Sequence, residues 1–332
     1  MKFASKTLTR FSAIAAVATV ALLGSAAALA QPAIIYDMGG KFDKSFNEAG
    51  YNGIERWKKE SGKPYLEFEI TNESQREQAI RRMAERNASP IIAMGFGQAS
   101  ALEKVAKDFP KLQFAIVDMV VNLPNVQSTV FKEQEGSFLV GTMAALASKT
   151  GKVGFVGGMD IPLIRRFQCG YEQGVKYANP KAEVFANMTG TTGAAWNDPA
   201  RGGELAKAQF SKGADVVFAA AGGTGMGVYQ AAKDGGKLAI GVDSNQNHLQ
   251  PGTMLTSMLK RVDVAVFNAA KNFKPGTSVL GLKESGVGFA MDANNEKLVT
   301  ADMKKKVEAA QADIISGKIK VADYMADNAC KF

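Results

Sequence analysis

The sequence of 332 residues contains few of the side chains that enzymes use for acid–base or metal chemistry. It has one histidine, His248, and two cysteines, Cys169 and Cys330. Hydrolytic catalysis needs a positioned general acid, a metal cluster or an activated nucleophile, and the Gly-x-Ser-x-Gly motif of serine hydrolases is also absent. We therefore expect no enzyme, no metal site and no cofactor, and we interpret His248 as a surface loop residue.

Neither an excess of charge nor a long apolar run marks the chain beyond residue 30. The formal net charge is +8, and three of these charges come from Lys2, Lys6 and Arg10, which leaves +5 for the remainder. The basic residues alternate with acidic ones, so nothing resembles a nucleic-acid-binding surface. No segment after residue 30 is apolar for 18 residues, which argues against a transmembrane helix.

Residues 1–30 have the features of a secretory signal peptide. A basic start precedes an apolar run over residues 11–23, and the small residues Ala28-Leu29-Ala30 suit a signal peptidase, with Gln31 as the expected mature N-terminus. A membrane anchor is the alternative interpretation. No cysteine lies near the cleavage site, so we expect no lipid anchor and a soluble protein in a bacterial periplasm. In that oxidising compartment, an even pair of cysteines favours a Cys169–Cys330 disulfide over two separate buried thiols.

Beyond residue 31 the pattern alternates between strands and helices, which is typical of an α/β fold with parallel sheets. The expected strands cover residues 33–37, 65–70, 90–94, 112–118, 152–157, 182–188, 215–221, 238–242, 254–260, 279–282 and 287–291. The expected helices cover residues 47–61, 73–87, 98–108, 133–149, 164–177, 200–211, 227–234, 262–273 and 300–316. Residues 122–131 have no helical period and suggest an extended connector.

This loose internal repeat predicts two lobes, each a parallel sheet flanked by helices. We expect the first lobe to contain residues 31–125 and 256–280, and the second to contain residues 126–255 and 281–332. Two such lobes enclose a cleft, and ligand sites favour positions between domains.

Polar residues gather where the first expected strand meets the first helix. In open α/β sheets, ligands bind outside the carboxyl ends of strands and near helix N-termini. Asp37, Lys44, Ser45, Phe46 and Asn47 would lie at this edge, where an aromatic side chain can stack on a flat ring. The alternative is a capped helix whose Phe46 packs in the core.

Other expected strands also end in carboxylates or glycines. Asp118 and Asp243 follow two of them, although acidic residues at such positions also cap turns. Residues 222–225 are Gly-Gly-Thr-Gly, but they lack the lysine of a P-loop and the spacing of a dinucleotide fingerprint. We interpret this segment as a tight turn with a close backbone approach.

Five motifs occur in the order and spacing of one protein family. They are Asp43-Lys-Ser-Phe-Asn47, Gly154-Phe-Val-Gly-Gly158, Trp196-Asn-Asp-Pro199, Gly241-Val-Asp-Ser-Asn245 and Thr256-Ser-Met-Leu-Lys260. Over almost the whole length after residue 31, the chain resembles the basic membrane protein family, also called purine nucleoside receptor A-like. These are substrate-binding proteins of ABC importers with a type I periplasmic-binding-protein fold.

The resemblance implies a ligand site in which a purine base stacks between two aromatic rings. Matched by motif, the residues fall into four groups: Phe46 and Trp196 as the aromatics; Asp37, Asp118, Asp243 and Lys260 around the ribose; Ser45 and Asn47 toward the base; Phe96 and Gly222 in matching strand-end loops. The alternatives are a surface position for Trp196 and a solvated Lys260. The chain departs from many relatives by lacking a lipobox cysteine and by carrying Trp196 where phenylalanine is common.

The resemblance predicts a monomeric periplasmic receptor that delivers guanosine, inosine or adenosine to an ABC permease. Charge-assisted hydrogen bonds from sugar hydroxyls to carboxylates suit a nucleoside, whereas the same carboxylates repel a nucleotide phosphate. The alternatives are a receptor for a sugar or another small polar ligand, and a nucleoside hydrolase. A transcriptional regulator of this fold would need a helix-turn-helix where the expected signal peptide stands.

Overall fold

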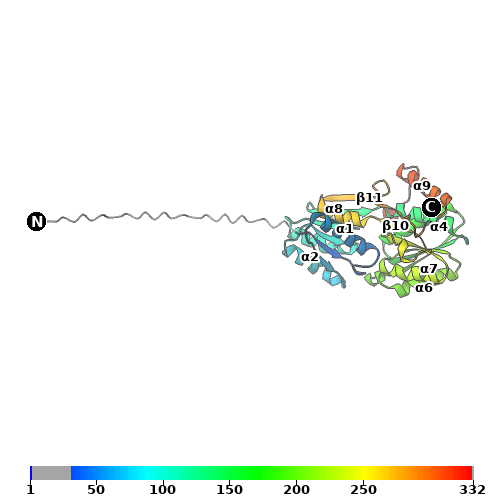
Figure 1. Cartoon of the computed structure of the whole chain (residues 1–332), viewed down its shortest axis with the longest axis horizontal. Coiled ribbons are helices and arrows are strands. Elements are labelled where there is room, and N and C mark those ends of the chain that lie inside the picture. Colours follow the sequence, from blue (N-terminus) through cyan, green and yellow to red (C-terminus); the bar gives the residue numbers. More distant parts are fainter. Residues whose placement is uncertain (2–30, 331–332) are drawn as a thin grey trace.

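Two six-stranded sheets, each flanked by helices, form the two lobes of the molecule (Figure 1). The computed structural model describes residue 1 and residues 31–330, so the signal peptide expected over residues 1–30 lies outside the described residues except for Met1. Among the described residues, the paired strands are parallel except for β10 and β12, which are antiparallel. The expected two-lobed α/β architecture is therefore confirmed.

The first lobe is built around a sheet with the strand order β11-β5-β4-β3-β1-β2. Its strands are β1 (Ala33–Tyr36), β2 (Leu66–Glu69), β3 (Ile91–Met94), β4 (Phe114–Val117), β5 (Val126–Phe131) and β11 (Gly276–Leu280). Its helices are α1 (Phe46–Ser61), α2 (Arg76–Glu85), α3 (Ala99–Asp108) and α8 (Val262–Lys271).

The second lobe repeats this plan with the strand order β12-β10-β9-β8-β6-β7. Its strands are β6 (Lys152–Met159), β7 (Glu183–Gly190), β8 (Val216–Ala220), β9 (Leu238–Asp243), β10 (Met254–Lys260) and β12 (Val287–Phe289). Its helices are α4 (Glu133–Ala147), α5 (Pro162–Ala178), α6 (Pro199–Ser211), α7 (Gly225–Asp234), α9 (Ala301–Ile315) and α10 (Tyr324–Asp327).

Position in the sheet explains the composition of the strands. β1 and β4 are central, and every residue in them is buried, as expected for parallel strands covered by helices on both faces. β2 lies at an edge, and half-buried Leu66 and Phe68 alternate in it with exposed Glu67 and Glu69. The hydrophobic cores lie between these sheets and their helices.

The chain crosses between the lobes after β5, after β10 and after β11. Two crossings differ from the boundaries expected from the sequence. Residues 126–131 are not a connector of the second lobe, because they form β5 and pair with β4 in the first sheet. Residues 256–260, expected in the first lobe, belong to β10 of the second sheet.

Polar side chains concealed β5 in the sequence. Gln127, Ser128 and Thr129 are all buried, although they have the composition of a surface loop. The Ser128 hydroxyl accepts a hydrogen bond from the Val121 N–H, and the side-chain Oε1 of Gln127 accepts one from the Lys274 N–H. Because buried polar groups are tolerated when they are hydrogen-bonded, the strand can enter the sheet interior.

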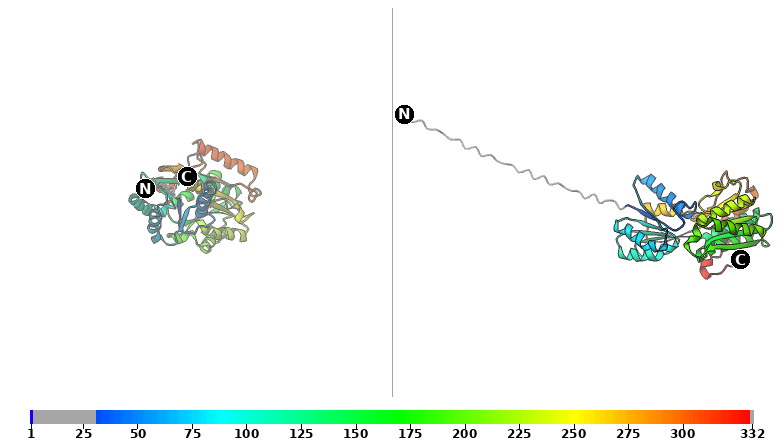
Figure 2. Two further views of the ribbon diagram at one scale, coloured as in Figure 1. Left: turned by 60° about the vertical axis from the view of Figure 1, so that its left-hand side comes forward. Right: turned by 90° about the horizontal axis from the view of Figure 1, so that it is seen from below.

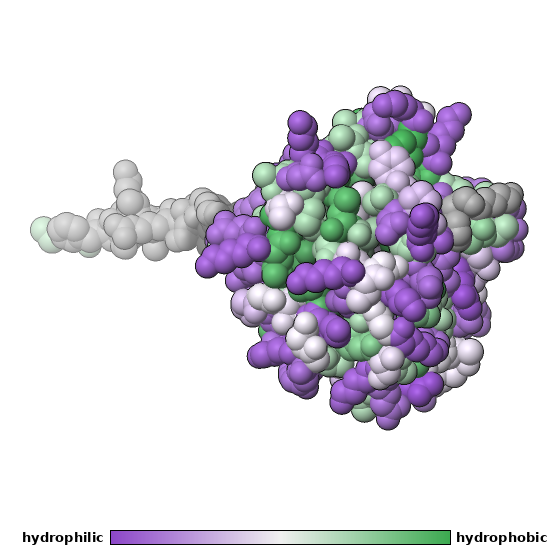
Figure 3. All heavy atoms as spheres, turned by 90° about the vertical axis from the view of Figure 1, so that its right-hand side faces the viewer, coloured by the Kyte–Doolittle hydropathy of each residue, from purple (hydrophilic) through white to green (hydrophobic). Residues whose placement is uncertain are grey.

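The C-terminal segment lies on the second lobe, near α5 (Figure 2). Cys169 of α5 and Cys330 form a disulfide, with 5.3 Å between their Cα atoms. Figure 3 shows hydrophilic side chains spread over one face of the molecule, with smaller hydrophobic areas between them. Within the described part of the chain, no helix is both long and apolar enough to cross a membrane.

Candidate functional site

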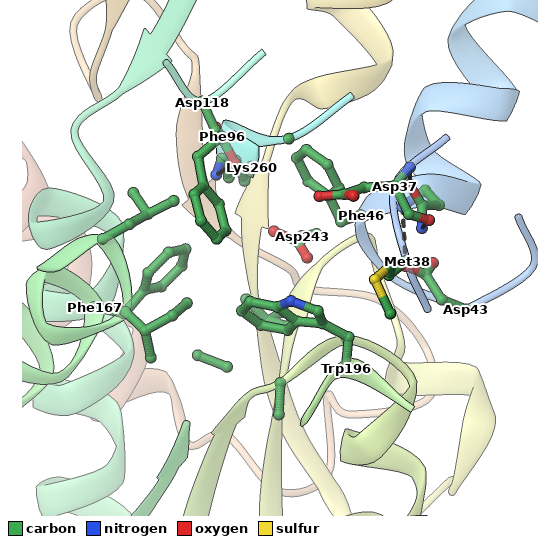
Figure 4. Close-up of a pocket in the computed structure, with 18 residues that line it drawn as sticks. Asp37, Met38, Asp43, Phe46, Phe96, Asp118, Phe167, Trp196, Asp243 and Lys260 are labelled. Atoms are coloured by element: carbon green, nitrogen blue, oxygen red, sulfur yellow. Dashed lines mark hydrogen bonds and ion pairs between the residues drawn. The ribbon is translucent and has the colours of Figure 1, made fainter. Parts of the chain in front are cut away.

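A cavity lies between the lobes at the carboxyl ends of the central strands (Figure 4). It contains about 590 Å³ of empty space, part of which is open to solvent. The first lobe contributes Asp37, Met38, Asp43, Phe46, Asn47, Gly95, Phe96 and Asp118. The second lobe contributes Leu163, Ile164, Phe167, Trp196, Ala220, Ala221, Gly222, Val242, Asp243 and Lys260.

The cavity brings together most of the residues that the sequence singled out. These are Asp37, Phe46, Asn47, Phe96, Asp118, Trp196, Gly222, Asp243 and Lys260. Lys44 and Ser45 do not line it. The Lys44 ammonium group instead pairs with Glu48 at 3.2 Å on the surface. Ser45 is fully buried, and its hydroxyl donates a hydrogen bond to the Asp243 carboxylate of the other lobe.

Lys260 is the centre of the charged end of the cavity. Its Nζ atom lies 2.7 Å from Oδ2 of Asp118 and 3.0 Å from Oε1 of Glu133, and its side chain is only 2 % exposed. Burial alone lowers the pKa of this ammonium group, but Asp118, Glu133 and Asp243 together raise the pKa above its ordinary value. Lys260 therefore stays charged.

The two aspartates beside Lys260 keep acceptor capacity for a ligand. Burial raises the pKa of Asp118 to about 6, although Lys260 opposes the shift. Burial also raises the pKa of Asp243, against Lys260 and the hydrogen bond from Ser45. The Oδ1 atom of Asp118 is buried and has no hydrogen-bond partner among the described residues. An orphaned carboxylate oxygen in a cavity is suited to accept a hydrogen bond from a ligand.

Asp118 and Asp243 also share an unusual backbone conformation. Asp118 directly follows β4, and Asp243 ends β9, with φ angles of 72° and 64°. This left-handed region is uncommon for residues other than glycine, and such conformations cluster at functional sites. Each lobe thus presents one aspartate in the same conformation to the cavity.

The opposite end of the cavity is organised by Asp37 (Figure 4). Arg76 lies 3.2 Å from Oδ1 of Asp37, and burial raises the pKa of this aspartate while Arg76 opposes the shift. The Asn47 side chain accepts a hydrogen bond from the Asp37 N–H and donates one to the Asp37 carbonyl oxygen. Asn47 therefore fixes the backbone that carries Asp37.

Asp43 borders the cavity but serves the N-terminus of α1. Its carboxylate accepts hydrogen bonds from the N–H groups of Ser45, Asn47 and Glu48, at 2.8, 3.0 and 3.1 Å. Burial raises the pKa of Asp43 to about 7, although these three N–H groups favour the ionised form. The capped turn fixes the start of the helix that presents Phe46 to the cavity.

Aromatic side chains from both lobes border the cavity. Figure 4 shows Phe46 and Trp196 on opposite sides of the space next to Asp243, with Phe96 and Phe167 farther along. A Cβ atom added to Gly158 of β6 would overlap the six-membered ring of Trp196. The Trp196 ring can therefore lie against β6 only because residue 158 is a glycine.

The sequence did not reveal the contribution of α5. Leu163, Ile164 and Phe167 fit the apolar face of a helix, and nothing local separates residues of a cavity wall from residues of a core. Glu133 was missed as well. Its position in the sequence indicates only the first residue of a helix, whereas in the structure it is fully buried beside Lys260.

Comparisons with known proteins agree with the fold. Residues 31–324 match a family model described as ABC transporter substrate-binding protein PnrA-like. The chain is 35% identical over 322 residues to the "CD4+ T-cell-stimulating antigen" of Listeria monocytogenes, covering 88% of this chain and 87% of the relative. It is 33% identical over 317 residues to "ABC transporter nucleoside-binding protein BmpA" of Lactococcus lactis, covering 87% and 88%.

A solved structure is similar over almost the same extent. This is an ABC transporter solute-binding protein from Aeropyrum pernix K1, with a TM-score of 0.82 and 30% identity. The similarity covers 89% of this chain and 93% of that one. The expected type I periplasmic-binding-protein fold is thereby confirmed.

Proposed function

Because the chain belongs to the PnrA-like family of ABC transporter substrate-binding proteins, we propose that its cleft binds a purine nucleoside for delivery from the periplasm to a membrane permease. The members of this family are binding proteins rather than enzymes. The single observation that carries the proposal is the pairing, in one cavity, of Phe46 and Trp196 with the buried Asp118–Lys260 ion pair. The Lactococcus lactis relative, which is named a nucleoside-binding protein, adds support.

The aromatic residues suit the base of such a ligand. A purine has two flat faces, and stacking of one base on an aromatic side chain contributes about 1–3 kcal/mol. Phe46 and Trp196 come from different lobes, so a base between them would hold the lobes together. A sugar alone would use this aromatic pair poorly.

The charged end suits the ribose. Vicinal hydroxyl groups donate hydrogen bonds to carboxylates, and such charge-assisted bonds are stronger than neutral ones. Asp118 has an unpaired oxygen there, and Lys260 limits the cost of burying the carboxylates. We assign Asp118, Asp243 and Lys260 to the ribose.

Asp37 is better placed for the base. The resemblance grouped it with the ribose residues, but it lies across the cavity from Lys260 and is paired with Arg76 instead (Figure 4). Arg76 contacts Oδ1, so Oδ2 can accept a hydrogen bond from a ligand. Guanine and hypoxanthine carry an N1–H donor and adenine does not, so this carboxylate favours guanosine and inosine.

The charge of the cavity predicts that nucleotides are excluded. Four aspartates, Asp37, Asp43, Asp118 and Asp243, border it, while Lys260 is the only basic residue among those that line it. A phosphate group brought into this surrounding would be repelled. We therefore expect nucleosides to bind and their monophosphates to be rejected.

Isothermal titration of the mature protein, unfolded and refolded to remove carried-over ligand, tests the proposal. Guanosine, inosine, adenosine, cytidine, ribose and GMP are titrated separately. We expect one-to-one binding of purine nucleosides, no binding of GMP, and affinities that Phe46→Ala or Asp243→Ala lowers. Phe42→Ala is the matched control, because Phe42 is 59 % exposed and does not line the cavity. Equal binding of ribose and guanosine would instead favour the sugar-receptor alternative.

A further inference from the structure

A chain of alternating charges leads from the cavity to the C-terminal segment. Asp118 pairs with Lys260, Lys260 with Glu133, Glu133 with Arg166, and Arg166 with Asp323. The N···O distances within these four pairs are 2.7, 3.0, 3.0 and 2.8 Å, in that order. These residues come from the end of β4, the end of β10, the start of α4, the first half of α5 and the cap of α10.

Glu133 is the central member of this chain. Its Oε1 faces Lys260, and its Oε2 accepts a hydrogen bond from Nη1 of Arg166. The side chain is 1 % exposed, so water cannot replace either cation. Arg166 also donates to the Phe131 carbonyl oxygen at the point where the chain enters the second lobe.

Arg166 connects Glu133 to residues 318–330, here called the C-terminal strap. Nε and Nη2 of Arg166 bind both carboxylate oxygens of Asp323, at 2.8 and 3.0 Å. Gln173 of α5 exchanges two hydrogen bonds with the backbone of Ala322. The Cys169–Cys330 disulfide anchors the end of the strap to the same helix.

The strap and the cavity thus share one helix. Leu163, Ile164 and Phe167 of α5 border the cavity, while Arg166, Cys169 and Gln173 hold the strap. The Nε and Nη2 groups of Arg166 both bind Asp323, so only Nη1 of Arg166 contacts Glu133. This division leaves Oε1 of Glu133 to Lys260.

We propose that Glu133 and Arg166 are positioning residues that hold the Lys260 ammonium group against Asp118, and that the strap sets ribose affinity through them. The inference rests on the proposed function, because it concerns the groups assigned to the ribose. Lysine is a flexible point charge on a four-carbon stem. A fixed counter-ion behind it preorganises the ammonium group and lowers the ordering cost on binding.

Asp323→Asn is the decisive variant, with Asp160→Asn as its matched control. Asparagine remains a good N-cap for α10 but removes the charge that holds Arg166. Asp160 likewise forms a two-bond pair with Arg165, but it is exposed and does not line the cavity. Each variant is titrated with inosine and with 2′,3′-dideoxyinosine, which has the same base but lacks the vicinal 2′- and 3′-hydroxyls.

We expect Asp323→Asn to lower the affinity for inosine by about fivefold and leave that for dideoxyinosine unchanged. Asp160→Asn should change neither affinity. If the strap had only a structural role, Asp323→Asn would lower the affinities for both ligands equally, and that result would overturn the inference. An unchanged inosine-to-dideoxyinosine ratio in Asp323→Asn would overturn it too, while leaving the proposed function intact.

Glu133→Gln and the double variant Cys169→Ser/Cys330→Ser provide independent readings. Glu133→Gln should reduce the same affinity ratio by about tenfold, because it removes a buried counter-ion of Lys260. The double cysteine variant should reduce the ratio in the same direction as Asp323→Asn. Wild-type protein that binds the two ligands equally would instead refute ribose recognition itself, and the inference would fall with the proposed function.

Discussion

The Ser45 hydroxyl of the first lobe donates a hydrogen bond to the Asp243 carboxylate of the second lobe. Two further hydrogen bonds join the same parts of the two lobes. The Ser244 hydroxyl donates to the Ser45 carbonyl oxygen, and the side-chain amide of Gln246 donates to the Lys44 carbonyl oxygen. The residues just before α1 thus contact the loop after β9 directly. Asp243 is therefore both a wall of the cavity and a contact between the lobes.

Loss of the Ser45 hydroxyl is expected to favour opening of the lobes. A hydrogen bond to a charged group contributes about 1.5–3 kcal/mol, so Ser45→Ala should raise the nucleoside dissociation rate by about tenfold or more. Stopped-flow tryptophan fluorescence measures this rate. Ser211→Ala is the control, because the Ser211 hydroxyl bonds only within α6 on the surface. Equal dissociation rates in the two variants would contradict a role in closure.

Gly158→Ala is expected to disturb the aromatic clamp without removing an aromatic residue. The new methyl group would overlap the Trp196 ring, so the indole must move away from β6. Part of the stacking contribution of about 1–3 kcal/mol would be lost. Calorimetry should show weaker binding of every purine nucleoside. Gly288→Ala in β12 of the same sheet should leave affinity unchanged, because nothing lies near the added Cβ atom.

Asp37→Asn is expected to change the order of base preference. The carboxylate only accepts hydrogen bonds, whereas the amide can also donate one to N1 of adenine. The affinity for inosine relative to adenosine should therefore fall by about tenfold, since discrimination by a buried hydrogen bond reaches that size. Competitive titration of the two nucleosides measures the ratio. An equal loss for both ligands would show that Asp37 does not distinguish the bases.

Acidification is expected to weaken ligand binding while stabilising the ligand-free protein. Burial raises the pKa of Asp118 to about 6, and it also raises the pKa of Asp243. A raised carboxyl pKa means that the folded state binds the proton more tightly than the unfolded state, so these groups favour folding increasingly as the pH falls from about 7 toward 4. The ribose needs ionised acceptors, so affinity should fall by up to about tenfold per pH unit below 6.

Calorimetric titration and chemical denaturation between about pH 4.5 and pH 8 check both trends. This range extends roughly one pH unit or more to either side of the raised pKa of Asp118. Asp118→Asn should flatten the pH dependence of affinity and lower affinity at pH 7. Lys260 does not contribute a transition in this range, because its pKa is raised above its ordinary value. Affinity that stays constant from pH 8 to pH 5 would contradict the assignment of Asp118 to the ribose.

Apart from β5 and the short helix α10, the order of strands and helices followed from local patterns in the sequence. Apolar runs such as Ala33–Tyr36 and Phe114–Val117 indicate strands buried on both faces, and they end at Asp37 and Asp118. Because parallel strands present their carboxyl ends at one edge, the sequence also placed Asp37, Asp118 and Asp243 near a common cleft. The fold, the family and a role as a binding protein are confirmed on this basis.

Only the tertiary structure decided which neighbouring side chains share a role. Ser45 and Phe46 are adjacent, yet one contacts the opposite lobe and the other lines the cavity. Glu133 and Lys260 are far apart in the chain, and their pairing depends on where α4 begins relative to the end of β10. Periodic burial is a local property that the sequence carries, whereas the partner of a buried charge is set by the crossing of distant elements.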